Sequence, residues 1–276
     1  QHLVHDAHSA GVPAVVVTFF PHPLEIIRGS KENNYLTHPQ ERAALLTSLG
    51  VDQVYTLEFS PELAGLTASE FIEDLHQALH FDRLVIGSDF ALGKGRQGNL
   101  EWLRQDGLAR GYQVDALQVV PADNDKISSS GIRQLLEAGE VSAAARCLGR
   151  PYSLSGEVVV GDQRGRTLGF PTANLSVWPR QMLPRNGVYA TRARLGAERF
   201  IAFTNVGTRP TFKPDAVDKK VEAYLLDFDR DIYGKMLTLE FSAFIRPEMR
   251  FESMQALMRQ IQKDIQFARE VAADET

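Results

Sequence analysis

The chain of 276 residues contains one cysteine, Cys147, and this scarcity excludes an internal disulfide and any cysteine-rich zinc site. Alanine and leucine neighbours around Cys147 favour a buried apolar residue over a nucleophile. No apolar run reaches the length that crosses a membrane, and the first residues do not read as a signal peptide. We therefore expect a cytoplasmic protein with no membrane partner.

Several catalytic motifs are absent as well. The sequence has no Walker A, G-x-S-x-G or H-E-x-x-H pattern, so P-loop, hydrolase and zincin interpretations have no support. The histidines are scattered without the spacing of metal ligands. The formal net charge is -5, which predicts no general attraction to nucleic acid.

The remaining composition is that of an ordinary globular protein, with 43% hydrophobic and 24% charged residues. The length favours two domains, which we place at residues 1–145 and 146–276. The boundary is set near residues 140–150, where the alternation of strand-like and helix-like patterns gives way to short strand-like segments without helices between them. No repeat or low-complexity tract is present.

The first part alternates between strand-like and helix-like patterns, which predicts an α/β domain with a parallel sheet and helices on both faces. Predicted strands cover residues 15–19, 51–57, 84–87 and 114–120. Predicted helices cover residues 1–10, 37–50, 67–79, 100–109 and 128–139, with capping boxes at Thr37 and Thr67. Because doubly wound sheets begin with a strand, we expect the first strand and its loop upstream of Gln1.

The second part contains short, alternating, turn-bounded strands without helices between them, which predicts an antiparallel barrel or sandwich. The predicted strands cover residues 154–161, 187–195, 200–206, 220–228 and 236–244. Met254, Leu257, Ile261 and Ile265 then recur at helical spacing and predict a terminal helix that packs on this sheet.

The most informative stretch is the extended segment 169–175, in which Thr172 and Asn174 point to the same side. Both offer neutral oxygen ligands that suit Mg²⁺, and the preceding glycines let backbone approach a phosphate closely. Glu222 supplies a carboxylate in a strand-like run about fifty residues later. These are the parts that phosphoryl transfer needs. A β-turn with satisfied threonine and asparagine side chains is the simpler alternative.

Three other features of the sequence allow more than one interpretation each. Residues 93–98 match the dinucleotide-binding pattern G-x-G-x-x-G, but residues 88–92 separate this pattern from the preceding strand. A loop that reads a nucleotide through Asp89, Lys94 and Arg96 is therefore favoured over dinucleotide binding. A plain solvated loop is the simpler alternative. Residues 128–133 combine hydroxyls and an arginine at a helix start, which predicts an anion site or a simple cap. His22 follows the carboxyl end of a strand, where ligands bind in open α/β sheets, or is a structural loop residue.

Taken together, these segments resemble the bacterial bifunctional riboflavin kinase/FMN adenylyltransferases, also called FAD synthetases. Residues 87–98 and 128–133 are similar to later motifs of the adenylyltransferase half, and residues 148–152, 165–174 and 221–235 to the kinase half. The resemblance implies a Rossmann-like nucleotidyltransferase domain followed by a six-stranded antiparallel barrel. It also implies small-molecule partners: riboflavin and FMN as substrates, ATP as co-substrate and Mg²⁺ as the cofactor.

By this resemblance, Thr172 and Asn174 hold Mg²⁺ and nucleotide phosphate, and Glu222 takes the proton of the ribityl 5′-hydroxyl. Backbone at Gly161, Gly165 and Gly169 supports the phosphates, and Arg246 contacts the flavin. The residues implied for the adenylyltransferase site are His22, Asp89, Phe90, Gly93, Arg96, Ser128, Ser129, Ser130 and Arg133.

The chain departs from the family in two respects. A G-x-F-D-G-x-H-x-G-H segment should end just before Gln1 and does not occur, so we expect an N-terminally shortened sequence with impaired FAD formation. Ser130 stands where threonine is common, and Tyr224 where histidine is common. Two rivals stay open: an NAD-dependent oxidoreductase built on residues 93–98, and a flavin- or RNA-binding barrel without catalysis, although the acidic balance counts against RNA. The oligomeric state is left open.

Overall fold

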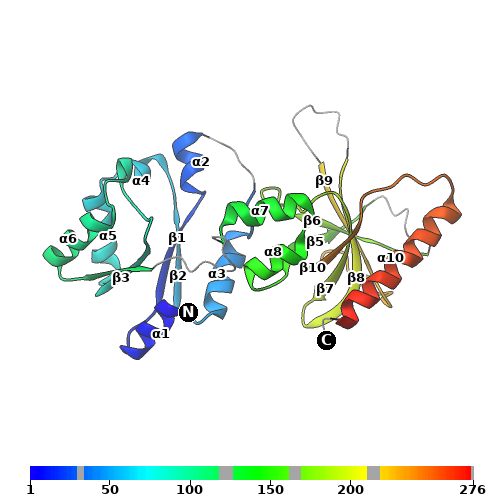
Figure 1. Ribbon diagram of the computed structural model, residues 1–276, viewed down its shortest axis with the longest axis horizontal. Coiled ribbons are helices and arrows are strands. Elements are labelled where there is room, and N and C mark those ends of the chain that lie inside the picture. Colours follow the sequence, from blue (N-terminus) through cyan, green and yellow to red (C-terminus); the bar gives the residue numbers. More distant parts are fainter. Residues whose placement is uncertain (30–33, 118–126, 162–168, 210–217, 275–276) are drawn as a thin grey trace. The chain divides into compact units, whose positions relative to one another are not determined.

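The computed structural model describes residues 1–29, 34–117, 127–161, 169–209 and 218–274, which form two compact units (Figure 1). Residues 1–32 and 37–126 make the first unit, and residues 33–36 and 127–276 make the second. The sequence placed a domain boundary after residue 145, and that boundary stays a prediction for the limits of the two functional domains.

The first unit is an α/β structure whose described strands pair in parallel, as the alternating pattern predicts. Strand β1 pairs with β2 and strand β3 pairs with β4, giving two separate two-stranded sheets in place of one continuous sheet. Its elements are α1 (His2–Ser9), β1 (Val15–Phe20), α2 (Pro23–Arg28), α3 (Pro39–Ser48), β2 (Gln53–Glu58), α4 (Pro61–Gly65), α5 (Ala68–Leu79), β3 (Arg83–Gly87), the 3₁₀ turn η1 (Lys94–Arg96), α6 (Leu100–Arg110) and β4 (Gln113–Leu117).

Helix starts in this unit follow local hydrogen bonding. The predicted capping box at Thr67 is confirmed, because Thr67 and Glu70 satisfy each other's backbone groups. The predicted box at Thr37 is wrong, since His38 is the N-cap of α3 and its Nδ1 accepts from the Gln40 amide at 3.2 Å. Proline at the first helical position is preorganised for a helix, so α3 begins one residue later than expected. The short helices α2 and α4 were not predicted.

A small core holds the β3–β4 pair against its helices. Ile72 of α5 and Leu103 of α6 are fully buried, and Ile86 and Tyr112 pack with them. The Tyr112 hydroxyl donates to Asp106 at 2.8 Å, and burial together with this bond raises the pKa of Tyr112. This cluster explains why α5 shows apolar residues mainly on one face, whereas α6 also carries Leu108, which is 87% exposed.

The second unit contains a closed six-stranded barrel in the order β10-β5-β6-β9-β8-β7, in which all described pairs are antiparallel. The barrel and the terminal helix therefore confirm the prediction for this part. Its elements are α7 (Ser129–Ala138), α8 (Val141–Leu148), β5 (Tyr152–Val159), β6 (Ala173–Val177), β7 (Gly187–Leu195), β8 (Glu198–Arg209), β9 (Asp218–Leu225), β10 (Met236–Arg246) and α10 (Met254–Asp274). Helix α8 was not predicted.

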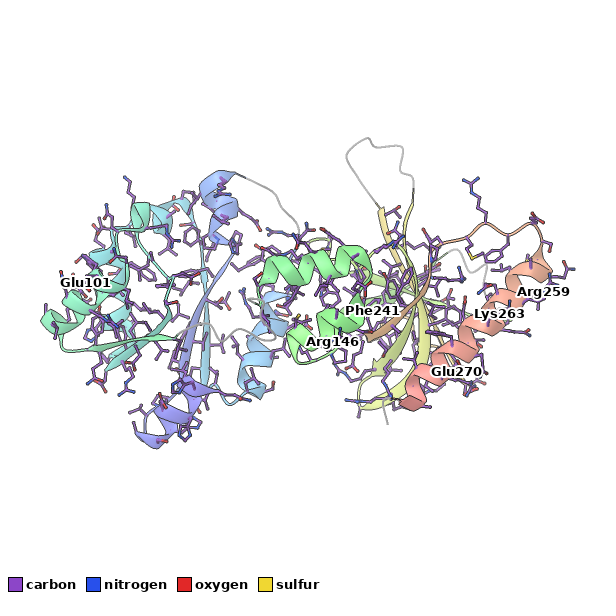
Figure 2. All side chains as sticks on the ribbon, in the orientation of Figure 1. Glu101, Arg146, Phe241, Arg259, Lys263 and Glu270 are labelled. Atoms are coloured by element: carbon purple, nitrogen blue, oxygen red, sulfur yellow. The ribbon has the colours of Figure 1, made fainter. Side chains whose placement is uncertain are left out.

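Alternation along β9 separates the inside of the barrel from its outside. Val221, Ala223 and Leu225 belong to the interior cluster, whereas Tyr224 packs in a second cluster under α10. Glu222 lies between Val221 and Ala223 and so points outward with Tyr224. Figure 2 shows Phe241 within the barrel and a row of charged side chains along α10. The outer face of the barrel therefore has an apolar part, which α10 covers, and a polar part.

Residues 34–36 precede α3 in the chain but pack on the barrel unit. The Tyr35 amide donates to the Arg180 carbonyl at 3.0 Å, and the Met182 amide donates to the Tyr35 carbonyl at 2.8 Å. The Tyr35 ring lies 5.2 Å from the Trp178 ring and 4.9 Å from the Arg180 guanidinium carbon. Tyr35 is 9% exposed. A segment from the first half of the sequence thus completes the structure around the end of β6.

Replacement of Tyr35 by alanine should destabilise the barrel unit by about 3 kcal/mol, because it removes a buried aromatic ring and its stacking partners. Hydrogen exchange of the β6 and β7 amides measures this loss, and the β3 and β4 amides serve as the internal reference. Tyr55, which is 41% exposed on β2, provides the matched control Tyr55→Ala. Equal protection of β6 in the two variants would contradict the role assigned to Tyr35.

Candidate active site

A cavity of about 350 Å³ opens between strands β5, β6 and β9 and the loop that follows β9. Buried Val158, Leu225 and Ile232 form an apolar part, and exposed Tyr233 lies at its edge. Among the described residues, its lining consists of Val158, Gly161, Pro171, Thr172, Ala173, Asn174, Leu225, Phe228, Asp229, Arg230, Asp231, Ile232 and Tyr233. An apolar wall with a few polar groups at one side is typical of a site for a small molecule.

Thr172 and Asn174, which the sequence places on one side of an extended segment, both line this cavity. The Asn174 amide lies directly against Gly161, where a methyl group would come within 2.2 Å of its Cγ and Nδ2. Glycine at position 161 therefore makes room for the asparagine side chain. Gly169 has φ of +81°, a conformation that favours glycine. Gly165 lies outside the described residues.

Glu222 lies directly opposite Asn174 in the β6–β9 ladder, and on its other side it faces Asn205 of β8. Partners in an antiparallel ladder point to the same face, with Cβ atoms about 5 Å apart. Asn174, Glu222 and Asn205 thus form one outward-facing row across three strands, which we call the polar row. The Lys220 ammonium lies 2.7 Å from Glu222 Oε1, and the Glu222 side chain is 19% exposed.

The loop after β9 adds polar residues to which the sequence analysis assigned no role. Asp231 Oδ1 accepts a hydrogen bond from the Tyr233 amide at 2.9 Å, which folds the loop back on itself. The Arg230 guanidinium lies 4.9 Å from the Phe228 ring centre and 2.8 Å from Glu198 Oε2. The only signal in the sequence was the aspartate-rich turn 227–234 between two strands.

Arg246 lies at the end of β10 and makes an ion pair with α10. Its Nε and Nη2 donate to the two oxygens of Asp264 at 3.0 and 2.7 Å, and Asp264 is fully buried. Gln260 also donates to Asp264, at 2.9 Å. The pair fixes α10 on the barrel, while contact between Arg246 and a flavin stays a prediction.

Residues 87–98 form a loop of the first unit. The Arg96 guanidinium donates to the Asp89 carbonyl at 3.0 Å, and Phe90 is 37% exposed. A methyl group at Gly93 would lie 2.4 Å from the Ala68 amide nitrogen, so this glycine permits contact with the start of α5. Because β3 ends at Gly87 and η1 precedes α6, the strand-to-helix turn of a dinucleotide fold does not occur here.

Two of the remaining predicted nucleotide residues, His22 and Ser128, are helix caps in the structure. His22 caps α2, and its Nδ1 accepts from the Leu24 amide at 3.2 Å. Ser128 caps α7 and accepts from the Gly131 amide at 3.1 Å. Arg133 donates to the Asn34 carbonyl at 2.6 Å. His22 and residues 87–98 belong to the first unit, whereas residues 128–133, with Ser129 and Ser130 in the first turn of α7, belong to the second.

Among the described residues, no group of three histidine, cysteine, aspartate or glutamate side chains could hold a metal ion. A cation at the cavity would instead use the neutral oxygens of Thr172 and Asn174 together with water and the oxygens of a bound phosphate, since Mg²⁺ keeps several waters and commonly takes substrate phosphates as ligands. No helix in the described part of the chain has the length and apolar character of a membrane span.

A carboxylate beside a threonine and an asparagine that could ligate a cation, next to a cavity for a small molecule, suits phosphoryl transfer better than redox chemistry. The barrel thus defines a phosphotransferase, joined here to an α/β unit. Comparison with known families agrees: the riboflavin kinase family matches residues 148–272, and the FAD synthetase family matches residues 1–131. The chain belongs to the bifunctional riboflavin kinase/FMN adenylyltransferase family.

Two relatives show how far the similarity extends. The bifunctional riboflavin kinase/FMN adenylyltransferase of Listeria monocytogenes is 36% identical over 95% of this chain and 83% of its own length. The Escherichia coli protein with the same description is 37% identical over 98% of this chain and 86% of its own length. A crystal structure described as a macrolide-efflux protein from Streptococcus pneumoniae has a TM-score of 0.87 at 32% identity, covering 96% of this chain and 86% of that one.

Removal of the Asp264 carboxylate by Asp264→Ala should lower the free energy of unfolding of the barrel unit by about 3–5 kcal/mol, because it leaves Arg246, only 14% exposed, without its counter-ion. Denaturant unfolding measures the change. Asp227→Asn is the matched control, since Asp227 pairs with Arg269 of the same helix but is 75% exposed, and asparagine tolerates the φ of +56° at this position. The control should lose less than about 1 kcal/mol. Equal losses would show that α10 does not depend on the buried pair.

Proposed function

We propose that the barrel unit transfers the γ-phosphoryl group of ATP to the ribityl 5′-hydroxyl of riboflavin, giving FMN and ADP. We also propose that the adenylyltransferase part joins FMN to the AMP moiety of a second ATP, giving FAD and pyrophosphate. The observation that carries the kinase proposal is the pairing of Glu222 with Asn174 across the β6–β9 ladder. It brings an acidic group to the edge of a cavity that can hold a nucleotide.

Charge distribution in the cavity supports one orientation of ATP. At the edge formed by Thr172, Asn174 and Gly161 the adjacent acidic side chain, Glu222, is paired with Lys220, whereas the loop after β9 carries Asp229 and Asp231 with Arg230 between them. Carboxylates repel phosphate, so we place the triphosphate at the Thr172 edge and the nucleoside toward the loop. Bound there, Mg²⁺ would neutralise charge on the transferring phosphoryl group, with Thr172 and Asn174 as its protein ligands.

Glu222 acts as the general base in this proposal. As the hydroxyl oxygen bonds to phosphorus and the bond between phosphorus and the bridging oxygen of ADP breaks, the hydroxyl proton passes to the Glu222 carboxylate. Lys220, 2.7 Å from Oε1, holds the carboxylate in place. Because Glu222 lies in a strand of a closed barrel, its distance from the cavity edge at Asn174 stays constant.

For the adenylyltransferase reaction we propose nucleotide-binding residues within each unit taken by itself: His22 and the loop with Asp89, Phe90, Gly93 and Arg96 in the first unit, and the start of α7 with Ser128, Ser129, Ser130 and Arg133 in the second. Support comes from the match of the FAD synthetase family to residues 1–131. The exposed amides and hydroxyls at the start of a helix are suited to a phosphate. A cytoplasmic location stays the prediction drawn from the lone cysteine.

Glu222→Gln should lower FMN formation from riboflavin and Mg-ATP by about 10² to 10⁴-fold, because a neutral amide cannot accept the proton. The measurement follows FMN by chromatography. Glu240→Gln is the matched control, since Glu240 also lies on a barrel strand but faces Arg192 and Ser153 in the ladders. Full activity of Glu222→Gln would show that Glu222 is not the general base. If the unaltered chain formed no FMN, the kinase proposal itself would be wrong.

A methyl group at position 161 should displace the Asn174 amide and weaken the cation site, because the two would overlap at 2.2 Å. Gly161→Ala is therefore expected to raise the Mg²⁺ concentration needed for half-maximal FMN formation by roughly tenfold, the loss of one good ligand. Gly65→Ala is the control, since nothing lies within 4 Å of a methyl group at that position. An unchanged Mg²⁺ requirement would show that Asn174 is not a ligand of the cation.

A further inference from the structure

Asn205 carries an unused hydrogen-bond acceptor at the end of the polar row. It lies on β8 directly opposite Glu222. Its Oδ1 atom is shielded from solvent and has no hydrogen-bond partner in the part of the chain that the structure describes. A buried acceptor without a donor destabilises the folded protein by roughly 1–3 kcal/mol. We therefore expect a ligand that donates a hydrogen bond to this oxygen.

The orientation of the Asn205 amide follows from its other neighbour. Asn205 Nδ2 donates to Glu248 Oε1 at 3.3 Å. A carboxylate accepts and cannot donate, so the amide nitrogen must face Glu248 and the oxygen must face the opposite way. Gly207 leaves the space for this carboxylate, because a methyl group there would lie 2.6 Å from Glu248 Oε1.

The direction of phosphoryl transfer determines what approaches Asn205. The nucleotide cavity lies on the Asn174 side of Glu222, and Asn205 lies on the other side. In an in-line transfer the attacking and leaving oxygens stand on opposite sides of phosphorus. The carbon chain of the alcohol must therefore extend away from the cavity, across the polar row toward Asn205.

We propose that Asn205 determines specificity for a polyhydroxylated alcohol: its Oδ1 accepts a hydrogen bond from a secondary hydroxyl of the ribityl chain while Glu222 takes the proton of the primary hydroxyl. This proposal rests on the kinase function proposed above. Side chains opposite each other in a ladder stand about 5 Å apart, which suits hydroxyls a carbon or two apart on one chain. Glu248 and Gly207 position the amide.

The inference predicts how substrates are ranked. A flavin with the same ring and a 5-hydroxypentyl chain keeps the primary alcohol but has no secondary hydroxyls. It would leave Asn205 Oδ1 unpaired in the complex, whereas riboflavin would satisfy it. A site built to bond a hydroxyl discriminates against the analogue that lacks it.

The test compares kcat/KM of the full chain for riboflavin and for the 5-hydroxypentyl flavin, both with Mg-ATP. The unaltered chain should prefer riboflavin by at least about tenfold, the worth of one hydrogen bond to a buried group. Asn205→Ala should lower kcat/KM for riboflavin by this same factor and leave kcat/KM for the 5-hydroxypentyl flavin unchanged. Asn186→Ala is the matched control, since the Asn186 amide bonds Thr208 at an exposed position, and it should retain the preference.

Gly207→Ala provides a second variant, because it keeps Asn205 and displaces only the end of the Glu248 side chain. It should reduce the preference for riboflavin in the same direction, and it decides the question if Asn205→Ala does not fold. A preference that survives in both variants, or an equal loss with both substrates, would overturn the role of Asn205. Failure of the unaltered chain to phosphorylate either flavin would instead overturn the kinase proposal.

Discussion

The kinase proposal depends on one register, the pairing of β6 with β9 that sets Asn174 opposite Glu222. A shift of this ladder by one residue would turn Glu222 toward the apolar interior and Val221 outward, because side chains alternate across a strand. The interior cluster around Val221 and Ala223 prevents such a shift, since it would expose these side chains and bury a carboxylate. Core packing thus sets the position of the predicted base.

Barrel closure gives the outer face two regions of different character. Along β8 and β9, Phe203 and Tyr224 pack beneath α10, while Asn205 and Glu222 lie one pleat further along the same face. The buried pair of Arg246 with Asp264 fixes the helix that covers the apolar region. The polar row lies outside the region that α10 covers, so one sheet serves both stability and chemistry.

The second unit draws on two distant parts of the chain. Tyr35 precedes the helices of the first unit, yet it packs against Trp178 and Arg180 just after β6, the strand that carries Asn174. Gln181 then donates to the Ser153 carbonyl at 3.1 Å and joins this segment to β5. Strand β6 is therefore stabilised by a segment of the other half of the chain, because residue 35 falls within residues 1–131, which match the FAD synthetase family.

Local patterns determined much of this protein: most of the strands and their faces, the Thr67 cap, the glycines and the extended segment with Thr172 and Asn174 follow from short-range spacing, and motif resemblance indicated the family. Spacing could not show that Glu222 would face Asn174, that Asn205 would extend their row, or that Tyr35 would join the barrel unit. It also missed α8 and the Arg246–Asp264 pair. These features depend on contacts between residues far apart in the chain, and only closure of the barrel and burial of its core decide which of them meet.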